Sequence, residues 1–489
     1  MIAAHDVRTA RYGERMDSTD RALVTDLQRL VRRLNELPDT REPEETRLGA
    51  LVREHLGVAA QSVPVTSEKV SPHRLADADI ALATVAAHDP DARLVGVAGG
   101  SERHHEDTQN LFAHRYTTFA PGPVEYVATA TGPQSTRQTV AFGLHLFRFD
   151  GEPVAVLVRN ASPMHGREAV TLDVLAVETQ VASQLLACLH EAMNEHSVIR
   201  GNVVSFAADE YGHGLGALTF LHRPRVGVDQ IVLPDGLLDS VRGHVIGIGE
   251  QADALLAYGQ HLKRGVLLYG PPGTGKTLTV EHLLSATPGR TAIVLQGGSL
   301  RFVAEAARLA RAMTPALLVF EDVDLVAMER DMFGGPQPLL FEILDALDGI
   351  GGDADIAFLL TTNRADLLEP ALAQRPGRVD LAVEIPLPDA GARRTLLALY
   401  ARDTPLSPAA LDAAADRAEG VTASFAKELV RRAALRAALA GAPLSDAHLD
   451  AALDEMLDSA NAMTRSFLGS GGGDGAAAGG AGHDAAMFE

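Results

Sequence analysis

The period of the hydrophobic pattern divides the chain into segments of different structure. Residues 18–37 carry apolar side chains three and four positions apart, which predicts a helix with Ser18 or Thr19 as its N-cap. From about residue 93 the pattern changes to short β-rich runs separated by glycine, proline and aspartate. These runs are RLVGVAG, VEYVATAT, QTVAFGLHLFRF, PVAVLVRN and VTLDVLAV. An amphipathic helix at 178–196 and two further strands, VIRGNVVSFA and GALTFLHR, complete an expected α+β domain over residues 1–225.

The second half of the chain alternates buried strands with helices after a linker at 223–241. The predicted strands are 265–269, 291–296, 316–320, 356–362 and 381–386, and the predicted helices are 278–286, 300–313 and 338–348. Such alternation predicts a parallel sheet that binds ligands at the carboxyl ends of its strands. We expect this α/β unit over 226–388, a helical unit over 389–465 and a disordered Gly/Ala-rich tail over 466–489.

A phosphate-binding loop follows the first strand of the α/β unit. Residues 270–277 (GPPGTGKT) match G-x-x-x-x-G-K-[ST] at every position, between a strand and a helix as the motif requires. The glycines let backbone N–H groups turn toward an anion, and the positive end of the following helix faces the same phosphates. The predicted nucleotide-binding residues are Gly270, Pro271, Pro272, Gly273, Thr274, Gly275, Lys276, Thr277 and Leu278.

Lys276 is expected to reach the β- and γ-phosphates of the nucleotide, and the Thr277 hydroxyl to bind Mg²⁺. The other lysines of the chain are Lys69, Lys263 and Lys427, whereas arginines are frequent. A lysine in this loop therefore indicates a need for a compact, flexible ammonium group rather than a planar guanidinium.

Polar residues after later strands are the candidates for catalysis. Glu321 and Asp322 come directly after a buried strand, where one carboxylate would hold Mg²⁺ and the other would orient the attacking water. Asn363 follows another strand and could reach the γ-phosphate or that water, although alone it could be a turn former. Arg375 and Arg378 lie on a Pro-Gly turn suited to reach a neighbouring subunit's nucleotide, although each alone could be a surface arginine.

Composition narrows the choice of partner and compartment. With 43 Lys+Arg against 64 Asp+Glu, the formal net charge of -21 argues against a nucleic-acid partner. The single cysteine, Cys188, excludes an intrachain disulfide and fits a reducing cytoplasm. No apolar run approaches the roughly 20 residues that span a bilayer, and the N-terminus lacks the apolar stretch of a signal peptide. We expect a soluble, cytoplasmic protein.

Four motifs taken together resemble those of AAA-family ATPases. They are GPPGTGKT, VFEDVD, TTNRADLLEPAL and RPGRVD, and the resemblance covers roughly residues 240–465, with EGVTASFAKELVRRA similar to the start of a lid helix of that family. The resemblance implies a P-loop ATPase module with a parallel sheet and helical lid, ATP and Mg²⁺ as cofactors, and a homo-oligomeric ring, most often a hexamer. It implies that Asn363 is a sensor residue and that Arg375 and Arg378 act in trans. The whole chain also resembles soluble bacterial AAA ATPases in which a similar N-terminal domain precedes the ring module.

The chain departs from the family pattern at several positions. The usual order after the strand is Asp then Glu, whereas this chain has Glu321 then Asp322, as in mitochondrial Bcs-type members. The shorter side chain would then polarise the water, so we expect slow hydrolysis. RPGR is preceded by an extra residue, so the sequence leaves open which of Arg375 and Arg378 is the arginine finger. The loop before helix 300–313 offers only Phe302 as an aromatic residue, which argues against threading of a polypeptide.

Three functions fit these observations. The first is an ATP-hydrolysing ring that remodels a protein partner chosen by the N-terminal domain. The second is a nucleotide-gated scaffold that binds ATP and hydrolyses it little, which the Glu-Asp order and the weak loop favour. The third, a nucleic-acid motor, is opposed by the net charge of -21.

Overall fold

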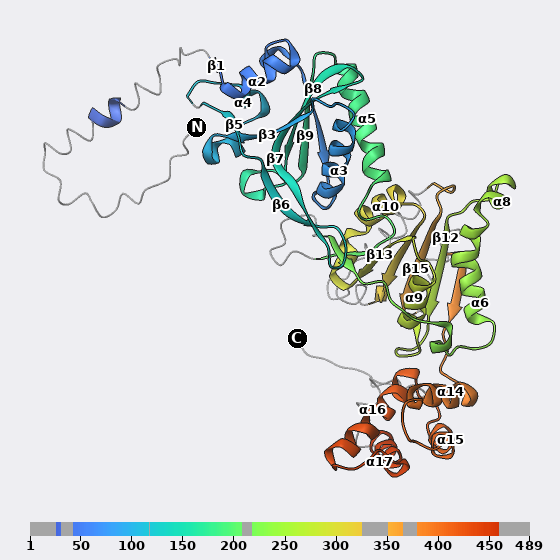
Figure 1. Cartoon of the computed structure of the whole chain (residues 1–489). Helices are drawn as coiled ribbons and strands as arrows, with labels where there is room; N and C mark the ends of the chain where they lie inside the picture. Colours follow the sequence, from blue (N-terminus) through green and yellow to red (C-terminus); the bar gives the residue numbers. More distant parts are fainter. Residues whose placement is uncertain are drawn as a thin grey trace, which may run out of the picture.

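The computed structural model describes residues 26–30, 43–116, 118–207, 218–324, 351–364 and 379–458. Of the predicted helix at 18–37 it describes only residues 26–30, which are helical. The predicted helix at 338–348, Arg375, Arg378 and the tail at 466–489 lie outside the described residues. Figure 1 shows three parts in chain order: an N-terminal sheet with its helices, a second sheet, and a group of helices below it.

The N-terminal sheet is antiparallel and has seven strands in the order β2-β9-β8-β7-β3-β5, with β6 paired to β7. The strands are β2 (Val65–Val70), β3 (Arg93–Ala98), β5 (Ala120–Gly122), β6 (Glu125–Ala130), β7 (Thr136–Phe149), β8 (Glu152–Arg159) and β9 (Val170–Ala176), and a small pair is formed by β1 (Glu44–Glu45) and β4 (Ala113–His114). The five β-rich runs of this region are therefore confirmed as strands.

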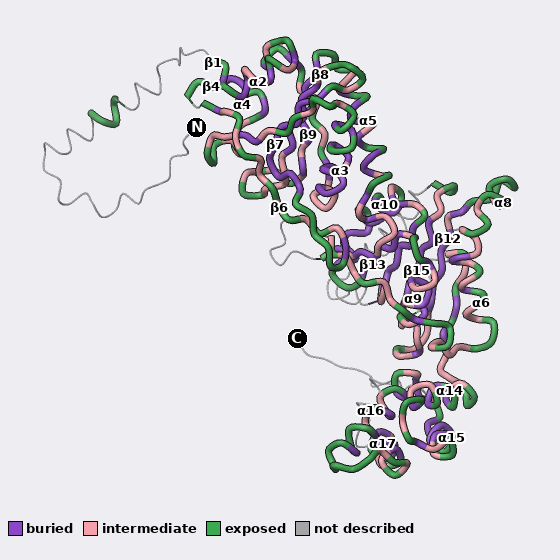
Figure 2. Tube along the Cα trace, in the orientation of Figure 1, coloured by how far each residue is buried: buried purple, intermediate pink, exposed green. Residues whose placement is uncertain are grey.

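Helices cover both faces of this sheet, which explains why its central strands are almost continuously apolar. The helices are α2 (Arg47–Leu56), α3 (Leu75–Ala86), α4 (Thr108–Phe112) and α5 (Thr179–Glu195). Val154 and Val156 of β8 pack in the core with α3 and α5, whereas Ala155 and Leu157 pack in the core with α2 and α4. Figure 2 shows the buried strands running between these helices.

The second sheet has the order β11-β10-β13-β14-β15-β12-β16, and every pair except β10–β11 is parallel. Its strands are β10 (Val203–Phe206), β11 (Leu218–Leu221), β12 (Arg264–Tyr269), β13 (Thr291–Gln296), β14 (Ala316–Glu321), β15 (Ile356–Thr362) and β16 (Leu381–Glu384). The predicted parallel sheet is confirmed, with the strand that leads into the phosphate-binding loop, β12, between β15 and β16.

Helices pack on both faces of the second sheet as well. They are α6 (Leu237–Arg242), α9 (Lys276–Ser285) and α10 (Val303–Ala312), the last preceded by the 3₁₀ helix η7 (Gly297–Phe302). The short helices α7 (Ile248–Glu250) and α8 (Ala252–Ala257) have no buried residues. Val280 and Leu283 of α9 join the core on one face, and Ala306 and Ala310 of α10 join the core on the other.

Strands β10 and β11 differ from the expectation. The sequence predicts both in the N-terminal domain, but β10 pairs in parallel with β13, with Val203 opposite Ala292 and Ser205 opposite Val294. The short apolar run that forms β10 specifies a buried strand and carries no information about which sheet it joins. In the structure it extends the second sheet beyond β13.

The C-terminal helices form a separate helical unit, which we name the lid after the expectation from the sequence. They are α14 (Ala390–Ala401), α15 (Pro408–Arg417), α16 (Ala423–Leu439) and α17 (Asp446–Leu457). The side chains of Asp389, Ser407 and Thr422 cap the first three by accepting a backbone N–H of the first turn. None of the helices in the described ranges combines the length and the apolar character required to cross a bilayer.

The N-terminal domain is fastened to the second sheet by polar contacts. Ser71 Oγ donates a 2.9 Å hydrogen bond to Glu305 Oε1 of α10. The Arg200 guanidinium donates to the carbonyl oxygens of Asn194, Ala312 and Thr314, which links the end of α5 to the connection between α10 and β14.

Candidate functional site

The phosphate-binding loop has the backbone that its glycines permit. Gly270, Gly273 and Gly275 have φ values of 141°, 77° and 114°, which lie in the region that residues with a side chain rarely adopt. A Cβ on Gly270 would lie 2.3 Å from the carbonyl oxygen of Ile385, whereas a Cβ on Gly275 would meet no atom within 4 Å. The loop is therefore packed against the sheet on one side and open on the other.

Lys276 begins α9 and is folded back into the loop. Its side chain is buried, and Nζ donates hydrogen bonds of 2.8 Å to the carbonyl oxygens of Gly270 and Pro271. Burial lowers the pKa of Lys276 to about 8, against the opposing effect of the Asp322 and Asp324 carboxylates. The ammonium group is thus held in the loop by two neutral carbonyl oxygens, which a phosphate could replace as acceptors.

Glu321 is the last residue of β14 and lies beside Thr277. Burial and the nearby charge of Asp322 raise the pKa of the Glu321 carboxyl, while a hydrogen bond with the Thr277 side chain lowers it. Its Oε1 is buried and has no hydrogen-bond partner among the described residues. A buried carboxylate oxygen without a partner, next to a hydroxyl, is a donor set that suits a divalent cation.

Asp322 and Asn363 meet across the ends of β14 and β15. Asn363 Nδ2 lies 3.4 Å from Asp322 Oδ1, and the Asp322 N–H donates a 2.9 Å hydrogen bond to Thr361 Oγ1. Asp322 has a φ of 50°, which is uncommon for a residue other than glycine. The Asp322 carboxylate lies beside Asn363 and lines a cavity, whereas Glu321 lies beside Thr277, so the two adjacent acids have different surroundings.

These groups line one cavity of about 400 Å³ between the second sheet and the lid. The start of α9 contributes Lys276 and Thr277, the ends of β14 and β15 are followed by Asp322 and Asn363, and the lid contributes Tyr400, Ser424 and Lys427. The carboxyl-edge placement predicted from the strand order therefore brings four of the predicted residues together. Glu321 does not line this cavity but lies behind Thr277.

The lid residues of this cavity were not predicted from the sequence. Lys427 lies on α16, and no hydrogen bond or ion pair reaches its ammonium group from the described residues. The rarity of lysine in the chain, which singles out Lys276, applies equally to Lys427 and was the signal that could have identified it.

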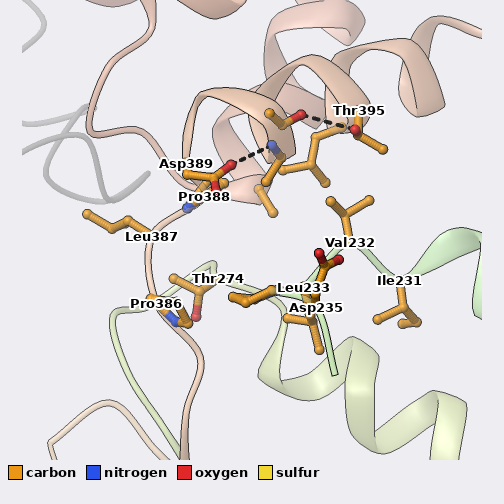
Figure 3. A pocket seen from close by; sticks show the side chains of 15 residues that line it. Ile231, Val232, Leu233, Asp235, Thr274, Pro386, Leu387, Pro388, Asp389 and Thr395 are labelled. Atoms are coloured by element: carbon orange, nitrogen blue, oxygen red, sulfur yellow. Dashed lines mark hydrogen bonds between the residues drawn. The ribbon is translucent and has the colours of Figure 1, made fainter. Parts of the chain in front are cut away.

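A second, larger cavity adjoins the phosphate-binding loop. It has a volume of about 580 Å³ and is shown in Figure 3. Its lining includes Ile231, Val232, Leu233, Thr274, Pro386, Leu387, Pro388, Leu396 and Ala423. The sequence predicts 223–241 only as a linker, yet this segment forms one wall of the cavity, whose lining also includes the polar residues Asp235, Asp389 and Thr395. Ala423 borders both cavities, so they lie on either side of the start of α16.

Phe302, the aromatic residue of the loop before α10, is buried in the core of the second sheet. Its ring lies 5.5 Å from the ring of Phe206 at the end of β10. It is therefore not presented to a partner in this structure. Arg375 and Arg378 lie outside the described residues, so their trans role stays a prediction.

Comparison with known proteins agrees with this geometry. Residues 266–387 match the family model described as "ATPase family associated with various cellular activities (AAA)". The 26S proteasome regulatory subunit 6B homolog of Saccharomyces cerevisiae is 36% identical over 202 residues, which cover 38% of this chain and 46% of the relative. The proteasome-activating nucleotidase of Aeropyrum pernix is 35% identical over 185 residues, covering 35% of this chain and 45% of the relative.

A third relative is the ATP-dependent zinc metalloprotease FtsH 3 of Sphaerobacter thermophilus, which is 34% identical over 189 residues, covering 36% of this chain and 38% of the relative. The chain thus aligns with less than half the length of each of these three relatives. The family match begins within β12 and ends just after β16, so it covers the phosphate-binding loop, Glu321, Asp322 and Asn363. The chain therefore contains an AAA domain, homologous to those of proteasomal and FtsH ATPases, over residues 266–387.

Proposed function

We propose that this protein binds ATP with Mg²⁺ and hydrolyses it. The observation that carries the proposal is the convergence of Lys276, Thr277, Asp322 and Asn363 on one cavity at the carboxyl edge of a parallel sheet. Substitution of Lys276 by Ala tests it most directly, because this removes the charge expected on the β- and γ-phosphates. Isothermal titration should show ATP binding to the wild type and none, or severely weakened binding, to Lys276→Ala.

In this proposal the two cavities hold different parts of the nucleotide. The phosphates occupy the polar cavity, where they replace the carbonyl oxygens of Gly270 and Pro271 as partners of Lys276. The base occupies the larger cavity, where Leu233 and Leu396 offer apolar side chains, on the other side of Ala423. The nucleotide would therefore join the sheet to the lid.

Glu321 and Thr277 are the residues that would hold Mg²⁺. The unpartnered Oε1 of Glu321 and the hydroxyl of Thr277 supply the oxygen ligands that this ion prefers. When bound, the ion neutralises charge that develops on the phosphate oxygens.

Asp322 would orient the attacking water and accept its proton. It lines the cavity and lies beside Asn363, whose amide can bind the water or the γ-phosphate. The division of roles between Glu321 and Asp322 is supported by their different surroundings: Glu321 is half-buried beside Thr277, and Asp322 lines the cavity.

We further propose that the protein acts as a homo-oligomeric ring, most simply a hexamer, on a protein partner bound by the N-terminal domain. Relatives named as a proteasome regulatory subunit and a proteasome-activating nucleotidase support an action on proteins. Arg375 and Arg378 would complete the site of the neighbouring subunit. The net charge of -21 favours a protein partner over nucleic acid, and the single cysteine favours the cytoplasm.

A nucleotide-gated scaffold with little hydrolysis is the second candidate. The buried Phe302 and the shorter side chain of Asp322 in the water-orienting position favour it. Steady-state phosphate release separates the two functions. A scaffold would bind ATP but release almost no phosphate, so Lys276→Ala would cause little further loss of turnover.

A further inference from the structure

Asp324 lies two residues beyond Asp322 and is buried, with a relative exposure of 3%. It does not line either of the cavities described above. Taking a carboxylate out of water is costly unless it is hydrogen-bonded, so its partners indicate what it is for.

Among the described residues, the hydrogen-bond partners of Asp324 both belong to the end of the neighbouring strand. Its Oδ1 accepts a 3.0 Å hydrogen bond from Thr362 Oγ1 and a 3.1 Å hydrogen bond from the Asn363 backbone N–H. In the opposite direction, the Asp322 N–H donates to Thr361 Oγ1 at 2.9 Å. The paired register of β14 and β15 ends at Phe320 opposite Leu360. Side-chain hydrogen bonds therefore continue the link between the strands past the point where backbone pairing stops.

Asp322 and Asn363 line the cavity from the ends of β14 and β15, and the backbone N–H of each donates to a side chain at the end of the other strand. Asp322 is held through Thr361, and Asn363 is held through Asp324. The direct contact between them, Asn363 Nδ2 to Asp322 Oδ1, is 3.4 Å long and by itself a weak hydrogen bond. The position of Asn363 relative to Asp322 therefore depends on Asp324 more than on their own contact.

We propose that Asp324 is a positioning residue for ATP hydrolysis, which holds Asn363 in register with Asp322 across the ends of β14 and β15. This inference rests on the proposed function. Asp324 does not touch the nucleotide in this account, so it should affect kcat far more than nucleotide affinity.

The test compares Asp324→Ala with Asp324→Asn in the full chain, with ATP titrations for Kd and steady-state phosphate release for kcat and KM. The alanine variant removes the acceptor of both hydrogen bonds, and a displacement of about 1 Å at a reacting group can cost on the order of 10²-fold in rate. We expect kcat to fall by that order while Kd for ATP stays within about threefold. The asparagine variant keeps Oδ1 as an acceptor and should recover most of kcat.

Asp355→Asn is the matched control. Asp355 immediately precedes β15 at the opposite edge of the sheet, where it pairs with Arg264 and Arg290. This variant should lower the melting temperature without the selective loss of kcat. If Asp324→Ala keeps the wild-type kcat, or loses kcat only in step with a loss of stability as Asp355→Asn does, the proposal is wrong.

A replacement variant covers the case in which Asp324→Ala does not fold, and a further comparison separates the positioning role from the proposed function. If Asp324→Ala does not fold, Asp324→Glu replaces it, since the longer side chain keeps the charge but displaces the acceptor; an unchanged kcat there overturns the proposal. Wild-type turnover that Lys276→Ala does not abolish would instead contradict the proposed function. The positioning role fails alone when turnover depends on Lys276 and not on Asp324.

Discussion

The backbone N–H of Ser424, in the first turn of α16, donates a 3.1 Å hydrogen bond to the carbonyl oxygen of Gly273 in the phosphate-binding loop. The lid therefore contacts the loop directly. Gly273 has a φ of 77°, and a Cβ on it would lie 2.9 Å from Ser424 Oγ and 3.1 Å from Thr422 Oγ1. Loop and lid are coupled through this one glycine.

Gly273→Ala should consequently weaken ATP binding. A left-handed backbone costs a residue with a side chain roughly 1–2 kcal/mol, and the added methyl group also pushes against the start of α16. We expect Kd for ATP to rise about tenfold, which corresponds to about 1.4 kcal/mol. Gly420→Ala is the control, because Gly420 has a φ of 76° but open space around it. Equal Kd values for the two variants would show that the loop–lid contact is unimportant.

ATP affinity should fall as the pH rises above about 8. Burial lowers the pKa of Lys276 to about 8 in the free protein, and bound phosphate favours the charged form. Above that pH the lysine must take up a proton on binding, so Kd should rise by up to about tenfold per pH unit. Titrations between about pH 7 and 9.5 test this, since the ordinary lysine pKa lies near 10.4. A flat profile would contradict a buried, phosphate-binding ammonium.

The same pKa shift should raise the free energy of unfolding as the pH rises, whereas ATP affinity falls. The folded protein releases the Lys276 proton near pH 8, whereas the unfolded chain keeps it until near the ordinary lysine pKa of 10.5. The unfolded state therefore binds more protons in this window, and the contribution of Lys276 to the free energy of unfolding rises between these pH values. The free energy of unfolding, measured by urea denaturation, should rise with pH in the wild type relative to Lys276→Met only between about pH 8 and 10.5.

The two adjacent acids should give different defects. Asp322→Asn should keep ATP affinity and lower kcat by about 10²-fold or more, because the water loses its general base. Glu321→Gln should also raise the Mg²⁺ concentration needed for half-maximal turnover, since a carboxylate oxygen is lost beside Thr277. Phosphate release measured over a Mg²⁺ titration distinguishes them. Equal, mild effects would contradict the division of roles.

Lys427→Ala should weaken ATP binding more modestly than Lys276→Ala. Lys427 reaches the polar cavity from the lid and is exposed, so solvent screens its charge and we expect an effect of about three- to tenfold on Kd. Arg431→Ala is the matched control, because Arg431 lies one turn along α16 and is paired with Glu428 outside the cavity. The variant pair should be compared with ATP and ADP, and an equal loss in both variants would point to a general effect of net charge.

Subunits with defects in different parts of a shared site should complement one another. Mixing Arg375→Ala/Arg378→Ala subunits with Lys276→Ala subunits creates interfaces that pair intact arginines with an intact phosphate-binding loop. An arginine supplied in trans contributes on the order of 10³-fold to turnover, so the mixture should recover activity that neither variant has alone. A mixture that assembles and stays inactive would rule out a trans role for these arginines.

The local parts of the site could be predicted because each is formed by residues that are contiguous in the sequence. GPPGTGKT needs only its own backbone to form a loop, and the β-rich runs at 291–296 and 356–362 became strands with those bounds. The ends of parallel strands meet at one edge, so the convergence of Lys276, Asp322 and Asn363 also followed from chain order.

The remaining features depend on contacts between segments that are distant in the sequence. Lys427 and Lys276 line one cavity only because the lid lies beside the loop, and Leu233 and Leu396 line the other cavity from segments far apart in the sequence. The role of Asp324 depends on hydrogen bonds to residues of the next strand. Neither the period of apolar residues nor local turn chemistry specifies such contacts.

The parallel pairing of β10 with β13 has a consequence for any shortened form of the protein. A chain that began at residue 226 would keep the phosphate-binding loop and the lid but would lack Val203–Phe206, and β13 would become an edge strand with unpaired backbone groups. Its buried run from Ala292 to Leu295 would then be open to pairing with other chains, which is a common route to aggregation. An independently folding ATPase fragment must therefore start ahead of Asn202, inside what the sequence alone marks as the other domain.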